Sequence, residues 1–88
     1  MTYNRETLYA RIGVELDRAY LKHGTERWSR HEFYAILLEE VEELWDAIKR
    51  DLPQEYVEQE MTQVAAMVFR FFETSLTMPE LPHDRATA

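Results

Sequence analysis

The side chains of this sequence that could do chemistry are carboxylates, and they gather in two stretches. Residues 37–50 read LLEEVEELWDAIKR, and residues 54–63 read QEYVEQEMTQ. Cysteine is absent, which excludes a thiolate zinc site and a thiol nucleophile. Oxygen ligands without thiolate or imidazole favour a hard cation, Mg²⁺ or alternatively Mn²⁺. Whether these acids bind such an ion depends on which of them face inward.

The first stretch belongs to a predicted helix that turns two of its acids inward. Apolar residues recur in it at three- and four-residue spacing, which indicates an amphipathic helix. On a helical wheel with Phe33 at zero, Glu40 falls at ~340°, inside the apolar sector, and Glu43 lies against its edge at ~280°. Glu39 and Glu42 point to water on the same wheel. This helix therefore carries both a solvated acidic face and an inward-facing pair of acids.

The second stretch lies on the following helix, which begins after an Asp-Leu-Pro turn at residues 51–53. With Tyr56 at zero, Glu60 falls at ~40° inside the apolar sector, and Gln63 borders that sector at ~340°. A short turn makes the two helices antiparallel, so that residues whose numbers sum to about 103 lie level with each other. Glu43 then meets Glu60, and Glu40 meets Gln63. Such a buried group of acids requires protonation, a cationic side chain or a metal ion.

The periodicity of the whole chain predicts an all-α fold, an antiparallel bundle of three main helices. The first helix is expected over residues 5–23, with Gly24 at its carboxyl end. The second should begin after a capping box formed by Ser29 and Glu32. The third should run to about Thr77, where Met78-Pro79 stops it. Residues 1–78 form one domain in this interpretation, and residues 79–88 form a mobile tail.

Charge and length limit the partners that this chain can have. Its formal net charge of −7 disfavours nucleic acid, which binds through clustered lysine and arginine. No stretch resembles a signal peptide or approaches the roughly 20 apolar residues of a membrane span, so we expect a cytoplasmic protein without membrane contact.

Three helices with such wide apolar sectors exceed what an 88-residue monomer can cover. We therefore expect a homodimer, or a higher homo-oligomer, that completes a four-helix core.

The acidic residues also resemble a known family. Residues 38–44, LEEVEEL, match the Glu-Glu-x-x-Glu signature of the MazG-like all-α nucleoside triphosphate pyrophosphohydrolases, and residues 60–63, EMTQ, stand where that family has Glu-x-x-Asp. The resemblance covers roughly residues 28–76. It implies Mg²⁺-dependent hydrolysis of nucleoside or deoxynucleoside triphosphates to the monophosphate and pyrophosphate, a housecleaning of the nucleotide pool. It also implies paired subunits with sites near their interface.

Carried over residue by residue, the resemblance implies that Glu40, Glu43 and Glu60 are Mg²⁺ ligands. Gln63 would be a further ligand, offering a neutral carbonyl oxygen where the family has a carboxylate. Glu39 is a secondary member of the motif, and either Glu39 or Glu43 is the candidate to orient the attacking water. The amide at position 63 lowers the charge of the site, and with it the affinity or the number of bound ions.

Contacts with the substrate beyond the metal follow from residue chemistry. The nucleotide base needs an aromatic face, for which Trp28 and Trp45 are the candidates, although Trp28 is also expected to pack against Phe33 as a hydrophobic staple. Trp45 is expected in the core. The phosphates need cations from the protein, for which the candidates are Lys49, Arg70 and Arg30.

Two other functions stay open at this point. A non-catalytic interaction or regulatory module would keep the MazG-like scaffold without the acid at position 63. A metal-binding protein that acts on another phosphate compound would keep the site but change the substrate. In a purely structural interpretation, the inward acids pair with Lys49 or Arg70 at a helix interface.

Overall fold

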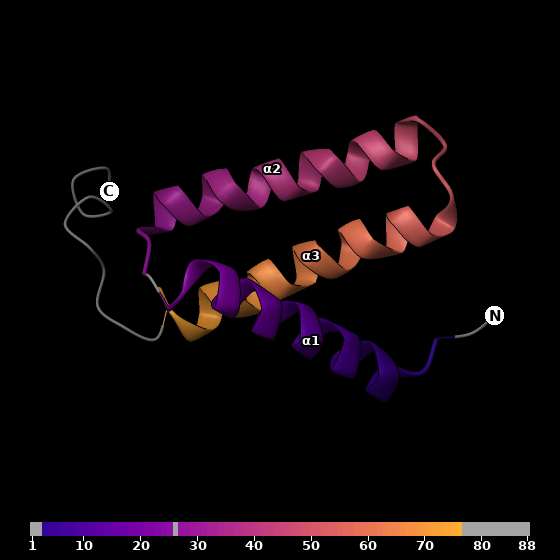
Figure 1. Ribbon diagram of the computed structural model, residues 1–88. Helices are drawn as coiled ribbons and strands as arrows, with labels where there is room; N and C mark the ends of the chain where they lie inside the picture. The colour runs from indigo at the N-terminus through magenta and orange to yellow at the C-terminus, as the bar shows by residue number, and fades with distance from the viewer. Residues whose placement is uncertain (1–2, 26, 77–88) are drawn as a thin grey trace.

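A computed structural model describes residues 3–25 and 27–76 of the chain. These residues form three α-helices and no strand: α1 (Arg5–His23), α2 (Arg30–Lys49) and α3 (Gln54–Glu73). The predicted all-α fold is confirmed. α3 packs against both other helices, while the described backbones of α1 and α2 do not contact each other (Figure 1). No helix within the described residues is long and apolar enough to cross a membrane.

Side chains before α1 and α2 fix where these helices begin. The Asn4 side chain accepts hydrogen bonds from the backbone N–H groups of Glu6 and Thr7. The Ser29 hydroxyl accepts from the Glu32 N–H at 3.1 Å, and the Glu32 carboxylate accepts from the Ser29 N–H at 2.9 Å. Both halves of the predicted capping box are thus present, and each satisfies an N–H that the helix cannot pair.

The connection between α2 and α3 is a tight turn that makes these helices antiparallel neighbours, as the sequence predicts (Figure 1). The N–H of Leu52 donates to the carbonyl of Ala47, and the N–H of Asp51 donates to the carbonyl of Ile48, both at 3.1 Å. These two hydrogen bonds form a Schellman motif, in which the residue after the C-cap adopts a left-handed conformation. Asp51 is that residue, with φ of 52°.

Substituting Asp51 with glycine is therefore expected to stabilise the protein. A left-handed conformation costs a residue with a Cβ roughly 1–2 kcal/mol, a cost that glycine avoids at the price of a more flexible unfolded chain. We expect a net gain of about 0.5–1 kcal/mol for Asp51→Gly and a loss for Asp51→Val. Thermal unfolding of the three proteins measures both changes, and a lower melting temperature for Asp51→Gly would contradict the assigned turn.

A cluster around Glu58 attaches the beginning of α1 to α3. Arg11 pairs with the Glu58 carboxylate at 3.1 Å, Gln54 donates to it at 2.7 Å, and the Tyr3 hydroxyl donates to it as well. The Tyr3 hydrogen bond, followed by those of Gln54 and Arg11, lowers the pKa of Glu58 to about 2. Glu58 therefore fixes α1 to α3 and takes no part in the acidic groove between α2 and α3.

The carboxyl end of α3 differs from the prediction. The helix ends at Glu73, four residues before the predicted end, and Thr77 lies outside the described residues. The Ser75 hydroxyl donates to the carbonyl of Trp28, which draws the chain out of the helical path toward the segment before α2. Met78-Pro79 and the predicted tail of residues 79–88 also lie outside the described part.

The apolar core is small for a chain of this length. Among the described residues, only Phe33, Ala47 and Ala66 are apolar and fully buried. Phe33 meets the Trp28 ring edge-on at 5.0 Å between centroids, which confirms the predicted staple. The placement of Trp45 in the core was wrong, because 56 % of this residue is exposed. α3 covers only part of the wide apolar sector of α2, and Trp45 lies on the uncovered part.

Candidate functional site

Three acids from α2 and α3 converge in the groove between these helices. Glu40, Glu43 and Glu60 each offer a carboxylate oxygen, and these oxygens all lie within 4.8 Å of one another. Glu60 thus lies beside Glu43, the residue predicted to lie level with it. The helical wheels and the turn position therefore predicted the convergence correctly.

The cluster is more open than the sequence indicated. Glu40 and Glu60 are half-buried, but Glu43 is exposed, so the three acids are not buried together as the sequence predicts. The reason lies in the arrangement of the helices, since α1 packs on α3 and does not close over α2. One side of the cluster is in contact with protein, and the other side faces solvent.

The charge of the cluster is unfavourable to the folded chain. Burial, followed by the negative charges of Glu43 and Glu60, raises the pKa of Glu40. Burial and the neighbouring Glu43 raise the pKa of Glu60. The charge of Glu15 on α1 adds to the effect on Glu40, which places a fourth carboxylate near the cluster. A raised pKa means that ionisation of these acids costs stability at neutral pH, a cost that a bound cation removes.

Gln63 contacts the cluster through its amide. With its amide nitrogen facing the acids, Gln63 lies 3.1 Å from Glu60 Oε2 and 3.2 Å from Glu40 Oε2, so that it donates to both. The prediction that Gln63 and Glu40 lie level with each other is confirmed by this distance. Donation from the amide partly stabilises the two carboxylates without a metal, although it adds no positive charge. To ligate a cation instead, Gln63 would turn its carbonyl oxygen toward the acids.

The donor set and its spacing suit a hard divalent cation. Mg²⁺ binds oxygen ligands at about 2.0–2.1 Å, so two ligands of one ion lie at most about 4.2 Å apart. The observed limit of 4.8 Å between the carboxylate oxygens exceeds this distance by only about half an ångström, within the reach of small side-chain rotations. Glu40, Glu43 and Glu60 therefore fit Mg²⁺ or Mn²⁺, with water completing the coordination.

A cavity of about 290 Å³ borders the cluster and receives its other wall from α1. Glu40, Glu43 and Gln63 line one side, and α1 contributes an acid, two cationic side chains and a histidine: Glu15, Arg18, Lys22 and His23. These α1 residues are not among the site residues predicted from the sequence. Their three- and four-residue spacing places Glu15, Arg18 and Lys22 on one helical face. This spacing can be seen in the sequence and could have identified them as neighbours.

A second groove of about 510 Å³ lies on the other side of the cluster, near the turn between α2 and α3. Glu39, Glu43 and Glu60 line it together with Asp46 and Arg50. Glu39 is exposed, as the helical wheel predicts. The acidic cluster therefore lies between two open spaces, of which the one beside α1 carries more cationic side chains.

Arg70, a predicted phosphate contact, is fully buried. Its guanidinium lies over the Trp28 ring at 4.2 Å and over the Tyr20 ring at 5.5 Å, and it donates to the carbonyl of Gly24 at 3.4 Å. Arg70 also lines the 290 Å³ cavity, so it is close to the site. One face of Trp28, the predicted base platform, is covered by Arg70.

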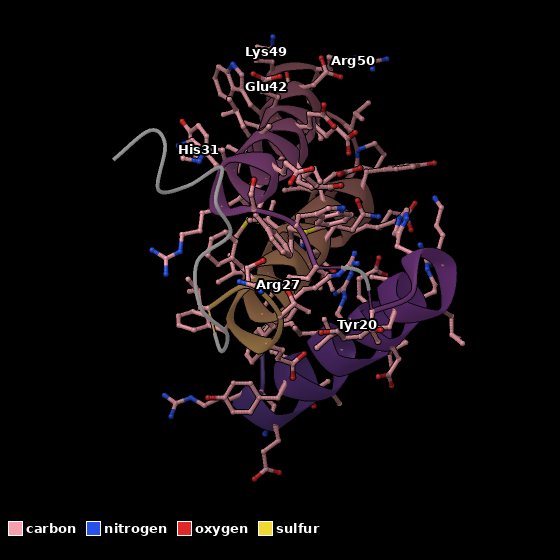
Figure 2. All side chains as sticks on the ribbon, turned by 90° about the vertical axis from the view of Figure 1, so that its left-hand side faces the viewer. Tyr20, Arg27, His31, Glu42, Lys49 and Arg50 are labelled. Atoms are coloured by element: carbon pink, nitrogen blue, oxygen red, sulfur yellow. The ribbon has the colours of Figure 1, made fainter. Side chains whose placement is uncertain are left out.

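The other predicted phosphate contacts lie away from the acids. Lys49 extends from the far end of α2 (Figure 2), 5.8 Å from the Trp45 ring. Lys49 and Arg30 line neither of the two cavities that border the cluster. The cationic side chains near the acids are instead Arg18 and Lys22, which line the 290 Å³ cavity beside α1, and Arg50, which lines the 510 Å³ groove near the turn.

Comparisons of the chain with protein-family models, curated proteins and solved structures gave no match. The functional assignment therefore depends on the motif residues and on their geometry. The strongest of these observations is that both motifs, separated by a turn in the sequence, meet at one cluster of carboxylates.

Proposed function

We propose that this protein is a Mg²⁺-dependent nucleoside triphosphate pyrophosphohydrolase of the MazG-like kind. It would hydrolyse nucleoside or deoxynucleoside triphosphates to the monophosphate and pyrophosphate. The observation that carries the proposal is the convergence of Glu40, Glu43 and Glu60 within 4.8 Å, beside a cavity whose opposite wall bears cations. Carboxylates beside cationic side chains suit a phosphate compound that binds together with a metal ion, because the acids bind the metal and the cations bind the phosphates.

The acids have separate roles in this proposal. Glu40, Glu43 and Glu60 hold the metal, which when bound neutralises phosphate charge and makes water a better nucleophile. Water attacks the α-phosphorus, the bond from that phosphorus to the bridging oxygen breaks, and pyrophosphate leaves. Glu39 lines the groove next to Glu43 and Glu60 and is placed to orient the water and accept its proton.

Cationic side chains of α1 would bind the phosphates. Arg18 and Lys22 line the cavity opposite Glu40 and Glu43, and both are exposed enough to reach a ligand. Arg18 already contacts Glu15 at 3.6 Å, which directs its guanidinium along the cavity side of α1. These two residues replace Lys49 and Arg30 as the best phosphate contacts, because those residues do not line the cavity.

The state of assembly and the location belong to the same proposal. We propose a homodimer that completes a four-helix core, because the chain alone buries few apolar residues. A housecleaning enzyme of the nucleotide pool would work in the cytoplasm. No nucleic-acid or membrane partner is proposed, since the net charge of −7 opposes polyanions and anionic lipid surfaces alike.

One observation favours the alternative of a non-catalytic module. Gln63 is placed to donate hydrogen bonds to Glu40 and Glu60, and this amide partly stabilises the acids without an ion. A module that had lost metal binding would benefit from such a contact. The alternative predicts a chain whose stability does not respond to Mg²⁺ beyond the effect of ionic strength.

Thermal unfolding with and without Mg²⁺ separates the two functions. At ten times its dissociation constant, Mg²⁺ that binds only the folded state stabilises it by about 1.4 kcal/mol. For a domain of this size we expect the melting temperature to rise by roughly 6–11 °C. NaCl at matched ionic strength is the control, because it screens the acids without ligating to them. A release of pyrophosphate from a panel of triphosphates should accompany the shift, and equal effects of both salts would refute the metal site.

A further inference from the structure

The two open spaces that border the acidic cluster differ in charge. The 290 Å³ cavity, here called the α1-side cavity, has Arg18 and Lys22 on its α1 wall. The 510 Å³ groove, here called the turn-side groove, is lined by five carboxylates and one cation, Arg50, which pairs with Asp46 at 3.2 Å. Phosphate groups are therefore attracted to the cavity and repelled from the groove. Of the parts of a nucleotide, only the neutral nucleoside suits the groove.

The geometry of the proposed reaction orients the substrate in the same direction. In phosphoryl transfer the attacking and leaving oxygens lie roughly in line, on opposite sides of the phosphorus. Glu39, which is placed to orient the attacking water, lines the turn-side groove. Pyrophosphate then leaves on the opposite side, toward Arg18 and Lys22 in the α1-side cavity. Of the two spaces that border the cluster, the turn-side groove is the one left for the nucleoside.

The α2 wall of the turn-side groove is one row of side chains. Glu39, Glu43, Asp46 and Arg50 line the groove and are spaced four, three and four residues apart, so they follow one face of the helix. Glu42 lies ~70° from the middle of this row on the helical wheel. Asp46 is three residues beyond the proposed ligand Glu43, or ~4.5 Å along the helix axis toward the turn. Asp46 is thus the acid of the row that follows the cluster.

Tyr56 lies on the α3 wall at the level of Asp46. It comes four residues before Glu60, or ~6 Å along the helix axis. The register that places Glu43 level with Glu60 also places Asp46 level with Tyr56. Tyr56 lines the groove together with the buried Ala47, and 51 % of the tyrosine is exposed. An aromatic ring and a carboxylate therefore stand on opposite walls of the groove, each about one helical turn from the cluster.

Tyr56 is also the ring that is available to a base. Neither Trp28 nor Trp45, the two candidates from the sequence, lines the groove or the cavity. One face of Trp28 is covered by Arg70, which lies 4.2 Å from the centre of its ring. Among the described residues that line the two spaces, Tyr56 is the only phenylalanine, tyrosine or tryptophan.

We infer that the turn-side groove holds the nucleoside of the substrate, with the base against Tyr56 and its hydrogen-bonding edge toward Asp46. This inference rests on the proposed function and names its substrate class. An ionised carboxylate only accepts hydrogen bonds, so it favours an edge that donates them. Adenine, cytosine and guanine carry an exocyclic amino group, whereas uracil and thymine have carbonyl oxygens on both sides of their single N–H. The site therefore prefers triphosphates of the amino-bearing bases over those of uracil and thymine.

Calorimetric titration with α,β-methylene analogues of CTP and UTP tests the preference, because a methylene bridge prevents the proposed hydrolysis. In Mg²⁺ the wild type should bind the cytidine analogue at least about tenfold more tightly than the uridine analogue. Asp46→Asn should reduce this preference to about threefold or less, since an amide both donates and accepts. The pair of Asp46 with Arg50 is more than half exposed, so the variant should fold normally. Equal binding of both analogues by the wild type, or an unchanged preference in Asp46→Asn, would overturn the inference.

Tyr56→Ala tests which end of the substrate lies in the groove. The dissociation constant of the cytidine analogue should rise about tenfold, the usual loss when an aromatic platform for a base is removed. The affinity for pyrophosphate in Mg²⁺ should stay within a factor of two, whereas Arg18→Ala should weaken it. Tyr9→Ala is the matched control, because Tyr9 is 60 % exposed and lines neither space. Equal losses of analogue and pyrophosphate in Tyr56→Ala would contradict the inferred orientation.

The inference and the proposed function can fail separately. A wild type that hydrolyses triphosphates, but whose affinity for the cytidine analogue survives Tyr56→Ala, would keep the proposed function and overturn the inference. A wild type that binds neither pyrophosphate nor the analogues in Mg²⁺ would overturn both. Tyr56→Ala should also keep the full Mg²⁺-induced rise in melting temperature, because Tyr56 is not one of the three convergent acids. Loss of that rise would mean that Tyr56 supports the acids and not the nucleoside.

Discussion

Glu60→Gln is expected to lower pyrophosphate release from nucleoside triphosphates by at least 100-fold and to remove the stabilisation by Mg²⁺. The substitution replaces one of three convergent carboxylates with a neutral amide of the same shape, so the ion loses charge compensation without a change in packing. Glu40→Gln should have the same effect. A phosphate-release assay coupled to pyrophosphatase measures the first outcome, and thermal unfolding in Mg²⁺ measures the second.

Glu42→Gln is the matched control, because it makes the same change of charge on the exposed face of α2, at a residue that borders the 510 Å³ groove but is not one of the three convergent acids. We expect activity within a factor of two of the wild type. If Glu42→Gln were as damaging as Glu60→Gln, the inward and outward faces of α2 would be assigned wrongly. If neither variant changed activity, the acids would not bind the metal that the reaction uses.

Glu40→Gln and Glu60→Gln should both make the folded protein more stable in the absence of metal. This increase in stability distinguishes a metal site from a structural ion pair. The pKa values of Glu40 and Glu60 are raised in the folded protein, by burial first and by neighbouring acids second. Folding therefore loses stability as the pH rises from about 4.5 through the raised pKa values. Removing one acid removes part of this loss, so both glutamine variants should melt higher than the wild type at pH 7 without Mg²⁺. A structural ion pair predicts the opposite change.

The sequence was sufficient to predict the cluster because each step needed only local information. The wheel of α2 depends on helical geometry alone, and the turn at residues 51–53 sets how α3 lies against it. The carboxyl end of α1 and the start of α2 followed from caps, which are also local. These elements agree with the structure, and the contacts of Gln63 with Glu40 and Glu60 follow from them.

The parts that the sequence did not predict depend on contacts between elements distant in the chain. A wheel shows a wide apolar sector but not which part of it a neighbour covers, so Trp45 was wrongly placed in the core. The position of α1 is set by its packing on α3 and by contacts such as Arg11 with Glu58, and for this reason Arg18 and Lys22 were not recognised beside the acids. The early end of α3 depends in the same way on the bond between Ser75 and the Trp28 carbonyl.

Arg70→Ala is expected to cause the largest loss of stability of any single change considered, about 3 kcal/mol or more. Arg70 is fully buried, and its guanidinium lies 4.2 Å from the Trp28 ring in a stack that also includes Tyr20. A desolvated cation–π contact contributes about 2 kcal/mol, and truncation of a buried long side chain leaves a cavity as well. For a domain of this size the melting temperature should fall by at least 12 °C. Chemical denaturation at constant pH measures the change.

Arg70→Met decides whether this arginine serves the fold or the substrate. Methionine fills a similar volume without a charge, and apolar replacements of buried ionic groups are often neutral for stability. If Arg70 acts only as a structural residue, Arg70→Met should recover most of the stability lost in Arg70→Ala and keep the KM for the triphosphate. Because Arg70 lines the cavity that also holds Glu40, a contact with phosphate would instead raise KM in Arg70→Met while the melting temperature recovers. The burial of the guanidinium between two aromatic rings favours the first outcome, since its faces are already occupied.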